Sequence, residues 1–134
     1  MKKAVIHSAK APAAIGPYSQ AIQAGGMLFT SGQLGIDPAT GALAPGVEAQ
    51  TDQAMRNLGE ILAQAGLTYA SILKTTVFVA DLADFSIVNT VYQGFFKSDY
   101  PARSCVQVAA LPKGGLVEIE CVALANSTEG TVGV

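Results

Sequence analysis

Residues 101–125 of this 134-residue chain read PARSCVQVAALPKGGLVEIECVALA, and they contain its clearest strand signals. Apolar and β-branched residues predict one strand over 102–110 and another over 117–125. The segment Pro112-Lys113-Gly114-Gly115 between them is typical of a turn. We therefore interpret the two strands as a hairpin.

The pattern upstream of this hairpin predicts an α+β fold. Gly25-Gly26 indicates a hairpin turn between two strands, and Asp37-Pro38-Ala39-Thr40-Gly41 indicates a further turn. Helical periodicity over 47–65 stops at Gly66, a residue typical of the position just past a helix. The remaining predicted elements are strands at 3–7, 19–24, 27–31 and 72–80, a capping turn at 81–84, and a helix with Phe85, Val88, Tyr92, Phe95 and Phe96 on its buried side. This order favours a sandwich of a mostly antiparallel sheet with two helices on one face.

Composition narrows the class of protein. Half of the residues are hydrophobic and only 13% are charged, with a net charge of −2. This length suits a single domain over 1–134, and the apolar surplus predicts a surface that meets another subunit, hence a homo-oligomer. The basic residues are scattered, which disfavours nucleic-acid binding. We find no signal peptide and no membrane span, so we expect a cytoplasmic protein with a flexible tail at 126–134.

The chemistry-bearing residues are few. The single histidine, His7, lies near the N-terminus, and no Cys-x-x-Cys pair is present. The glycines match neither a Walker loop nor a dinucleotide fingerprint. We therefore expect no metal and no cofactor. The two cysteines, Cys105 and Cys121, are expected to be free thiols in apolar strands.

Arg103 and Glu118 are the strongest candidates for a site. Side chains alternate along a strand, so Arg103 and Cys105 should share one face, as should Glu118 and Glu120. An arginine on one strand of a hairpin can meet a glutamate on the next, and its planar fork fits a carboxylate. Pattern alone leaves a structural Arg–Glu pair and a carboxylate clamp equally open, and it favours a structural role for Glu120.

Several motifs, taken in order, resemble the RidA (YjgF) family. They are Ala13-Ala14-Ile15-Gly16-Pro17-Tyr18-Ser19-Gln20-Ala21, Thr30-Ser31-Gly32-Gln33 with the turn at 37–41, Lys74-Thr75-Thr76-Val77-Phe78-Val79 with Asp81, Leu82, Phe85 and Asn89, then Pro101-Ala102-Arg103-Ser104-Cys105-Val106, Leu111-Pro112-Lys113 and Val117-Glu118-Ile119-Glu120. The resemblance covers residues 3–125 without a large gap.

The resemblance implies a chorismate-mutase-like α+β fold and a homotrimer with three clefts between subunits. It implies hydrolysis of the reactive imines and enamines 2-iminobutanoate and 2-aminoacrylate to 2-oxo acids and ammonia. Arg103 matches the arginine that grips the substrate carboxylate, and Glu118 matches the glutamate that positions or activates water. The residues that match the lining of the same cleft are Tyr18, Ser31, Gly32, Asn89 and Cys105.

Two other functions stay open at this point. A non-catalytic trimer that binds or senses a 2-oxo acid would use the same arginine clamp. The older family labels of endoribonuclease and translation inhibitor fit the scattered basic residues less well.

Overall fold

A computed structural model describes residues 2–125, and the predicted tail at 126–134 lies outside the described residues. The chain begins with β1 (Ala4–Ile6), β2 (Ala21–Ala24) and β3 (Met27–Thr30), each antiparallel to the one before. The turn between β2 and β3 lies at Gly25 and Gly26, with φ of 59° and 78°. Both values belong to the left-handed region that a two-residue hairpin turn of type I′ needs, so the predicted turn is confirmed.

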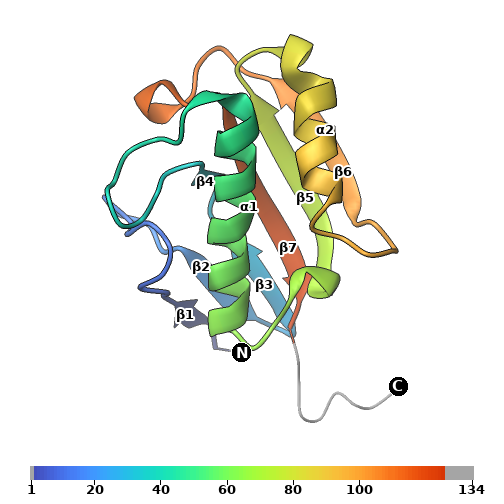
Figure 1. Ribbon diagram of the computed structural model, residues 1–134. Coiled ribbons are helices and arrows are strands. Elements are labelled where there is room, and N and C mark those ends of the chain that lie inside the picture. Colours follow the sequence, from blue (N-terminus) through green and yellow to red (C-terminus); the bar gives the residue numbers. More distant parts are fainter. Residues whose placement is uncertain (1, 126–134) are drawn as a thin grey trace.

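One mixed sheet forms the body of the protein (Figure 1). Its strand order is β1-β2-β3-β7-β5-β6, where β5 is Ile72–Val79, β6 is Ala102–Gln107 and β7 is Val117–Leu124. A two-residue strand that the sequence did not predict, β4 (Gln33–Leu34), also pairs with β7. The pairings are antiparallel except for the parallel pair of β5 and β6. The mostly antiparallel sheet of the prediction is confirmed.

The last two strands correct one prediction. We expected β6 and β7 to form a hairpin across residues 112–115, but β5 lies between them. The chain leaves β6, crosses the end of β5 and returns as β7, so the segment with Pro112 and Gly114 is a crossover. Strands β5 and β7 pair along seven residues of β7, from Val117 to Ala123. Long-range pairing of this kind has no local sequence signal, which explains the error.

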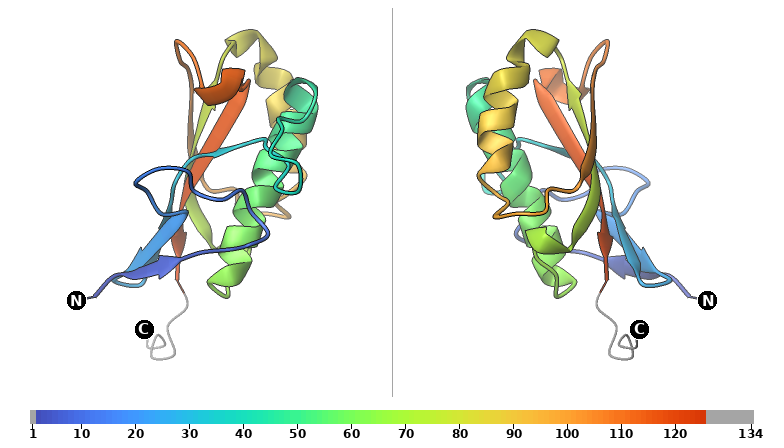
Figure 2. Two further views of the ribbon diagram at one scale, coloured as in Figure 1. Left: turned by 90° about the vertical axis from the view of Figure 1, so that its left-hand side faces the viewer. Right: turned by 90° about the vertical axis from the view of Figure 1, so that its right-hand side faces the viewer.

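The two helices lie on one face of the sheet, as predicted (Figure 2). Helix α1 (Gly46–Gln64) buries the apolar residues Ala54, Met55, Leu58, Ile61 and Leu62. Just past its end, Gly66 has a φ of 77° and the amide of Leu67 donates to the carbonyl of Leu62 at 2.8 Å. Each fully buried Leu or Ile contributes about 1.5–3 kcal/mol to folding.

Helix α2 (Phe85–Gln93) covers the sheet beside β5 and β6. Val88 and Tyr92 are buried as expected, and Phe96 is buried just past the helix end. Phe85 was also predicted on the buried side, but 38% of it is exposed. The prediction was wrong because Phe85 lies at the first turn of α2, where its ring contacts Arg103.

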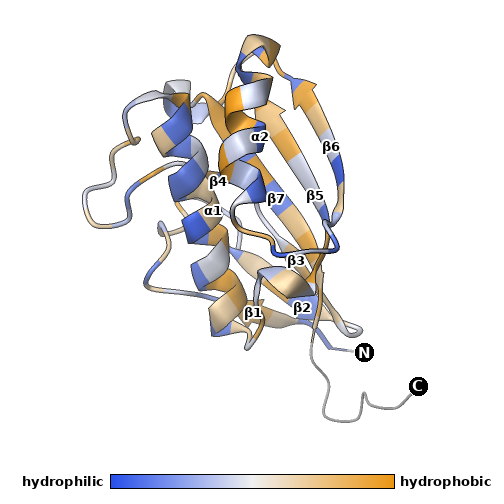
Figure 3. Ribbon diagram, turned by 45° about the vertical axis from the view of Figure 1, so that its right-hand side comes forward, coloured by the Kyte–Doolittle hydropathy of each residue, from blue (hydrophilic) through white to orange (hydrophobic). Residues whose placement is uncertain are grey.

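The other face of the sheet carries no helix (Figure 2), and hydrophobic residues alternate with polar ones along the strands (Figure 3). Phe29, Val106 and Leu124 are exposed large apolar side chains on β3, β6 and β7. Strand alternation places them with Glu118 and Glu120, opposite the buried residues of β7. Exposed apolar surface on a sheet is typical of a surface that meets another subunit. Within residues 2–125 no helix has the length and apolar character needed to cross a membrane.

Candidate active site

Arg103 lies on β6 with its side chain on the helix side of the sheet. It is paired in register with Thr75 of β5, a fully buried residue. Its guanidinium carbon is 5.1 Å from the centre of the Tyr92 ring and 5.4 Å from the centre of the Phe85 ring. Its Nη1 donates a 2.6 Å hydrogen bond to Oδ1 of Asn89. These three partners belong to one face of α2, at spacings of four and three residues.

These contacts hold Arg103 without neutralising it. Among the described residues, the ion pair found joins Arg56 to Asp52 on α1 and does not involve Arg103. Aromatic faces attract a guanidinium but carry no net charge, and the Asn89 oxygen takes up one of its five N–H donors. The side chain lines a cavity of about 430 Å³ together with Asn89, Tyr92, Gln93, Tyr100 and Pro101. We call these six residues the arginine half-site, and its free donors suit a carboxylate.

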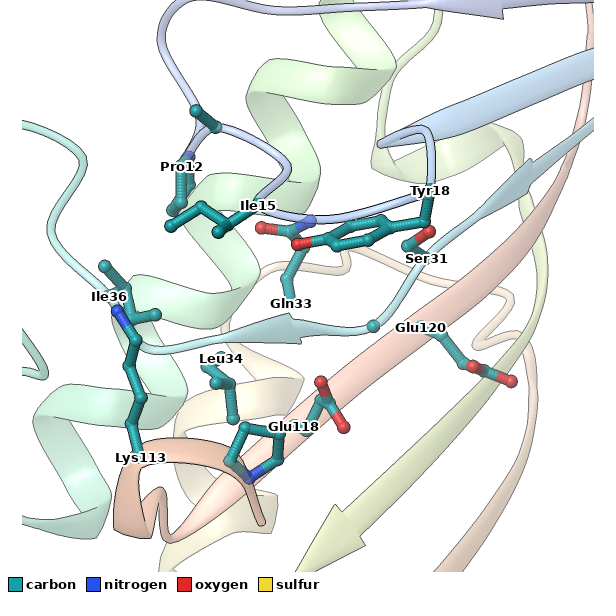
Figure 4. Close-up of a pocket in the computed structure, with 13 residues that line it drawn as sticks. Pro12, Ile15, Tyr18, Ser31, Gln33, Leu34, Ile36, Lys113, Glu118 and Glu120 are labelled. Atoms are coloured by element: carbon teal, nitrogen blue, oxygen red, sulfur yellow. The ribbon is translucent and has the colours of Figure 1, made fainter. Parts of the chain in front are cut away.

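Glu118 lies on β7 with its side chain on the opposite side of the sheet. It lines a separate cavity of about 650 Å³ (Figure 4). The carboxyl group of Glu118 points into this cavity toward Tyr18, whereas that of Glu120, which also lines the cavity, points away from Tyr18. We call this the glutamate half-site. Its lining residues include Pro12, Ile15, Tyr18, Ser31, Gly32, Gln33, Leu34, Ile36, Lys113, Glu118 and Glu120.

The surroundings of Glu118 favour its protonated form. Burial first, and the charge of Glu120 second, raise the pKa of the Glu118 carboxyl group above its ordinary value. A carboxyl group with a raised pKa in a cavity is a candidate for general acid–base work.

Gly32 and Ser31 shape the glutamate half-site in different ways. A Cβ at Gly32 would lie 2.7 Å from Cδ of Glu118, so only glycine lets the carboxyl group sit where it does. The Ser31 hydroxyl donates a 2.6 Å hydrogen bond to the carbonyl of Ser19, next to Tyr18. Ser31 was predicted to bind substrate, and here its hydroxyl holds the Tyr18 loop.

The loop before β2 is held by a buried glutamine. Oε1 of Gln20 accepts from the amide of Ser8 at 2.6 Å, and Nε2 donates to the carbonyl of Pro12 at 2.8 Å. Between these anchors the loop carries Ile15 and Tyr18, both exposed, over the cavity (Figure 4). The loop therefore presents an apolar wall and one phenol to the glutamate half-site.

Cys105 lies two residues beyond Arg103 on the same side of β6, and it packs against the core. It lines neither half-site. Burial raises the pKa of its thiol, while the charge of Arg103 partly offsets this. A thiol with a raised pKa is less often present as the nucleophilic thiolate, so these surroundings do not favour covalent catalysis by Cys105. No group of three or more His, Cys, Asp or Glu that could hold a metal ion lies within the described part of the chain.

The two half-sites do not meet within one chain. Arg103 and Glu118 were expected to face each other across neighbouring strands, but β5 separates their strands. Arg103 contacts α2, whereas Glu118 alternates with the buried Val117 and Ile119 and so points away from the helices. That prediction is wrong for a single subunit, and the two groups can act together only if a second copy brings them together.

Sequence reasoning missed part of both half-sites. Tyr92 was read as a core residue because it lies on the apolar face of α2, and it is indeed 4% exposed. A polar Asn89 three residues before it on an apolar helix face was the available signal. Leu34 and Ile36 reach the glutamate half-site on β4 and the residues after it, and Lys113 reaches it from the crossover. The turn at 112–115 had a local signal, but the pairing that brings these segments together had none.

Comparison with known proteins gives consistent matches. The family described as Endoribonuclease L-PSP matches residues 8–125. A protein of Bos taurus named 2-iminobutanoate/2-iminopropanoate deaminase is 55% identical over 90% of this chain and 88% of its own length. A Yersinia pestis structure described as YyfA of the Rid protein family is 49% identical, with a TM-score of 0.91 over 92% of this chain and 100% of its own. The structure of E. coli TdcF with bound serine is 44% identical, with a TM-score of 0.89 over 92% and 99% of the two chains.

Proposed function

Because this chain belongs to the endoribonuclease L-PSP family, also named RidA or YjgF, we propose that it is an imine deaminase. Its substrates are 2-iminobutanoate and 2-aminoacrylate, and its products are 2-oxo acids and ammonia. Support comes from a relative that is 55% identical and is named for the deamination of 2-iminobutanoate and 2-iminopropanoate. The serine bound to E. coli TdcF carries the same kind of carboxylate.

The observation that carries the proposal is the state of Arg103. Its guanidinium is held by Asn89 and two rings, and no carboxylate of the described residues forms an ion pair with it. A fixed arginine with free parallel N–H donors binds a carboxylate through two charge-assisted hydrogen bonds. Arg103 therefore anchors the substrate by the group that all the proposed substrates share.

The chemistry needs little more than this anchor and one proton carrier. The enamine 2-aminoacrylate first takes up a proton at its methylene carbon and loses one from nitrogen, which gives the imine 2-iminopropanoate. Protonation of the imine nitrogen makes the C=N carbon more electrophilic, and the oxygen of water adds to that carbon as water loses a proton. The nitrogen of the resulting carbinolamine is protonated, the C–N bond breaks, and ammonia leaves as the hydroxyl group loses its proton and the C=O bond forms. Glu118 takes the proton from water and returns it to nitrogen, a role worth roughly 10²–10⁴-fold in rate.

We propose that each cleft combines the arginine half-site of one subunit with the glutamate half-site of its neighbour. The half-sites lie on opposite faces of the sheet, so a single chain cannot close the site. The exposed apolar residues Phe29, Val106 and Leu124 supply a surface for association. The family resemblance supports a homotrimer with three clefts. We also propose that the protein is located in the cytoplasm.

A coupled assay tests the activity. An amino-acid dehydratase releases the imine, and formation of the 2-oxo acid is followed with and without this protein. We expect Arg103→Ala to abolish the acceleration while the oligomer persists in analytical ultracentrifugation. Arg56→Ala is the matched control, because Arg56 is a solvent-exposed arginine paired with Asp52 on α1. Full activity of Arg103→Ala would refute the proposal.

Glu118→Gln should lower turnover more than affinity for the 2-oxo acid. Equal losses of both would indicate a structural role. Wild-type protein that binds 2-oxobutanoate in calorimetry but does not accelerate hydrolysis would instead indicate a non-catalytic binding protein.

A mixing experiment tests whether the cleft is shared. Arg103→Ala and Glu118→Gln are unfolded together and refolded at equal amounts. In a shared cleft, each site draws its arginine and its glutamate from different subunits, so about one quarter of the clefts regain both groups in a closed symmetric oligomer. We expect about that fraction of wild-type activity to return. No recovery in correctly assembled mixed oligomers would show that each subunit supplies both groups to one cleft.

A further inference from the structure

Tyr92 occupies a position that no part of the proposed reaction explains. It lies on α2, it is 4% exposed, and its ring lies against the guanidinium of Arg103 at 5.1 Å. Its hydroxyl forms a 2.7 Å hydrogen bond with the hydroxyl of Thr75. Thr75 is fully buried and is the register partner of Arg103 on the neighbouring strand. Tyr92 thus bridges the two strand residues, with its hydroxyl on one and its ring on the other.

The remaining contacts do not fix the guanidinium by themselves. The hydrogen bond from Arg103 to Asn89 holds one nitrogen, and a planar group held at one atom can still rotate about that contact. Phe85 is 38% exposed and has no polar atom that would lock its ring. Arginine loses considerable rotamer freedom when it is ordered, so an arginine held loosely binds a carboxylate less tightly.

The Tyr92 ring, in contrast, cannot rotate freely. A change of its χ1 torsion moves the phenol oxygen and breaks the buried hydrogen bond to Thr75. The ring also packs against Phe96, with the ring centres 5.0 Å apart. A buried ring locked at both its face and its tip gives Arg103 a fixed surface.

We propose that Tyr92 is a positioning residue that sets the plane of Arg103 for two-point capture of the substrate carboxylate. The proposal rests on the proposed function, because it concerns the same arginine. Tyr92 does not touch the reacting atoms. Its loss therefore weakens carboxylate binding and leaves the chemical step of bound substrate intact.

Two variants separate the effect of the Tyr92 ring from the effect of its hydrogen bond to Thr75. Tyr92→Leu removes the aromatic face, and we expect KM for the imine and Kd for 2-oxobutanoate to rise about 2- to 30-fold, the range of a cation–π contact. The turnover number at saturation should stay within about twofold. The pair Tyr92→Phe with Thr75→Val keeps the ring and removes both hydroxyl groups, so no buried hydroxyl is left without a partner. We expect a smaller rise in Kd for this pair, about 2- to 3-fold, because the ring remains but is no longer locked.

The decisive measurement is a double-mutant cycle on 2-oxobutanoate binding, followed by calorimetry or NMR titration. Tyr92→Leu is compared in the wild-type and the Arg103→Gln backgrounds. A positioning role predicts that its effect disappears when Arg103 is gone, whereas a purely structural role predicts the same loss in both backgrounds. Unchanged affinity of Tyr92→Leu, or equal losses in both backgrounds, would overturn the proposal.

The controls keep the outcomes distinct. If Tyr92→Leu does not fold, the pair with Thr75→Val carries the test alone, and wild-type affinity of that pair overturns the proposal. If the wild-type protein neither hydrolyses the imine nor binds 2-oxobutanoate, both the proposed function and this inference are refuted. If the wild-type protein and the Tyr92 variants bind 2-oxobutanoate equally well, this inference is refuted and the proposed function stands.

Discussion

Replacing Gly32 by alanine tests whether the position of the Glu118 carboxyl group controls turnover. An alanine Cβ at this position would lie 2.7 Å from Cδ and 2.8 Å from Oε2 of Glu118. Non-bonded carbon atoms are most stable at about 3.5–4.0 Å, so the carboxyl group must move by roughly 1 Å. The far end of a glutamate side chain moves more easily than backbone, so the fold should survive and the catalytic geometry should not.

The expected size of the effect follows from this displacement. A misplacement of about 1 Å in a catalytic group costs about 10²-fold in rate. We therefore expect kcat/KM of Gly32→Ala to fall about 10²-fold, or about 2.7 kcal/mol of transition-state free energy. Initial rates of 2-oxo acid formation in the coupled dehydratase assay measure it.

Gly94→Ala is the matched control for this substitution. Gly94 follows α2 with a φ of −65°, and a Cβ there would meet only the Val91 carbonyl oxygen, at 3.4 Å. Both substitutions reduce the entropy of the unfolded chain, an effect of about 0.4–1 kcal/mol, so thermal unfolding should not separate them strongly. A folded Gly32→Ala variant with kcat/KM within threefold of wild type would refute the reasoning, since the carboxyl position would then not matter.

Further predictions concern charge, the loop and the core. The raised pKa of Glu118 means that the folded state holds that proton more tightly than the unfolded chain, so stability falls as pH rises between the two pKa values. Glu120→Gln removes one cause of the raised Glu118 pKa and should move the acid limb of the pH profile of log kcat/KM to lower pH. If that limb does not move, a group other than Glu118 controls it. Ser31→Ala frees the Tyr18 loop and should raise KM more than it lowers kcat, and a pure loss of kcat would contradict this. Asn57→Leu leaves the carbonyls of Leu34 and Ile36 without their donor, at 3.1 and 2.9 Å, and should lower the free energy of unfolding by about 1–3 kcal/mol in urea titration, whereas an unchanged midpoint would argue against that role.

Local elements could be predicted because their signals are local. The period of apolar residues predicted α1 to within a residue at each end, and Gly66 stops it where φ becomes 77°. Two adjacent glycines with positive φ marked the first hairpin. The turn over 81–84 was expected to offer an N-cap, and within it the Asp81 side chain accepts from the amide of Ala83, whereas Asp84 at the start of α2 makes no side-chain cap.

The site could be predicted only as a set of residues. Which strands are neighbours depends on pairing between distant segments, so the place of β5 between β6 and β7 was invisible to a local reading. That single fact decides whether Arg103 and Glu118 meet. The alternation rule placed Arg103 with Cys105, and Glu118 with Glu120, on shared faces, but it could not say that the two pairs lie on opposite sides of the sheet.

The back-to-back placement of the two half-sites has a genetic consequence in the proposed trimer. Every subunit lends its arginine to one cleft and its glutamate to another. A copy that folds and assembles but has lost both Arg103 and Glu118 therefore disables two clefts, although it is only one of three subunits. In a cell that makes equal amounts of the normal and the damaged chain, the loss of activity should exceed one half whenever the damaged copy lacks both groups. Damage to this protein should accordingly be partly dominant when it spares assembly, and recessive when it prevents assembly.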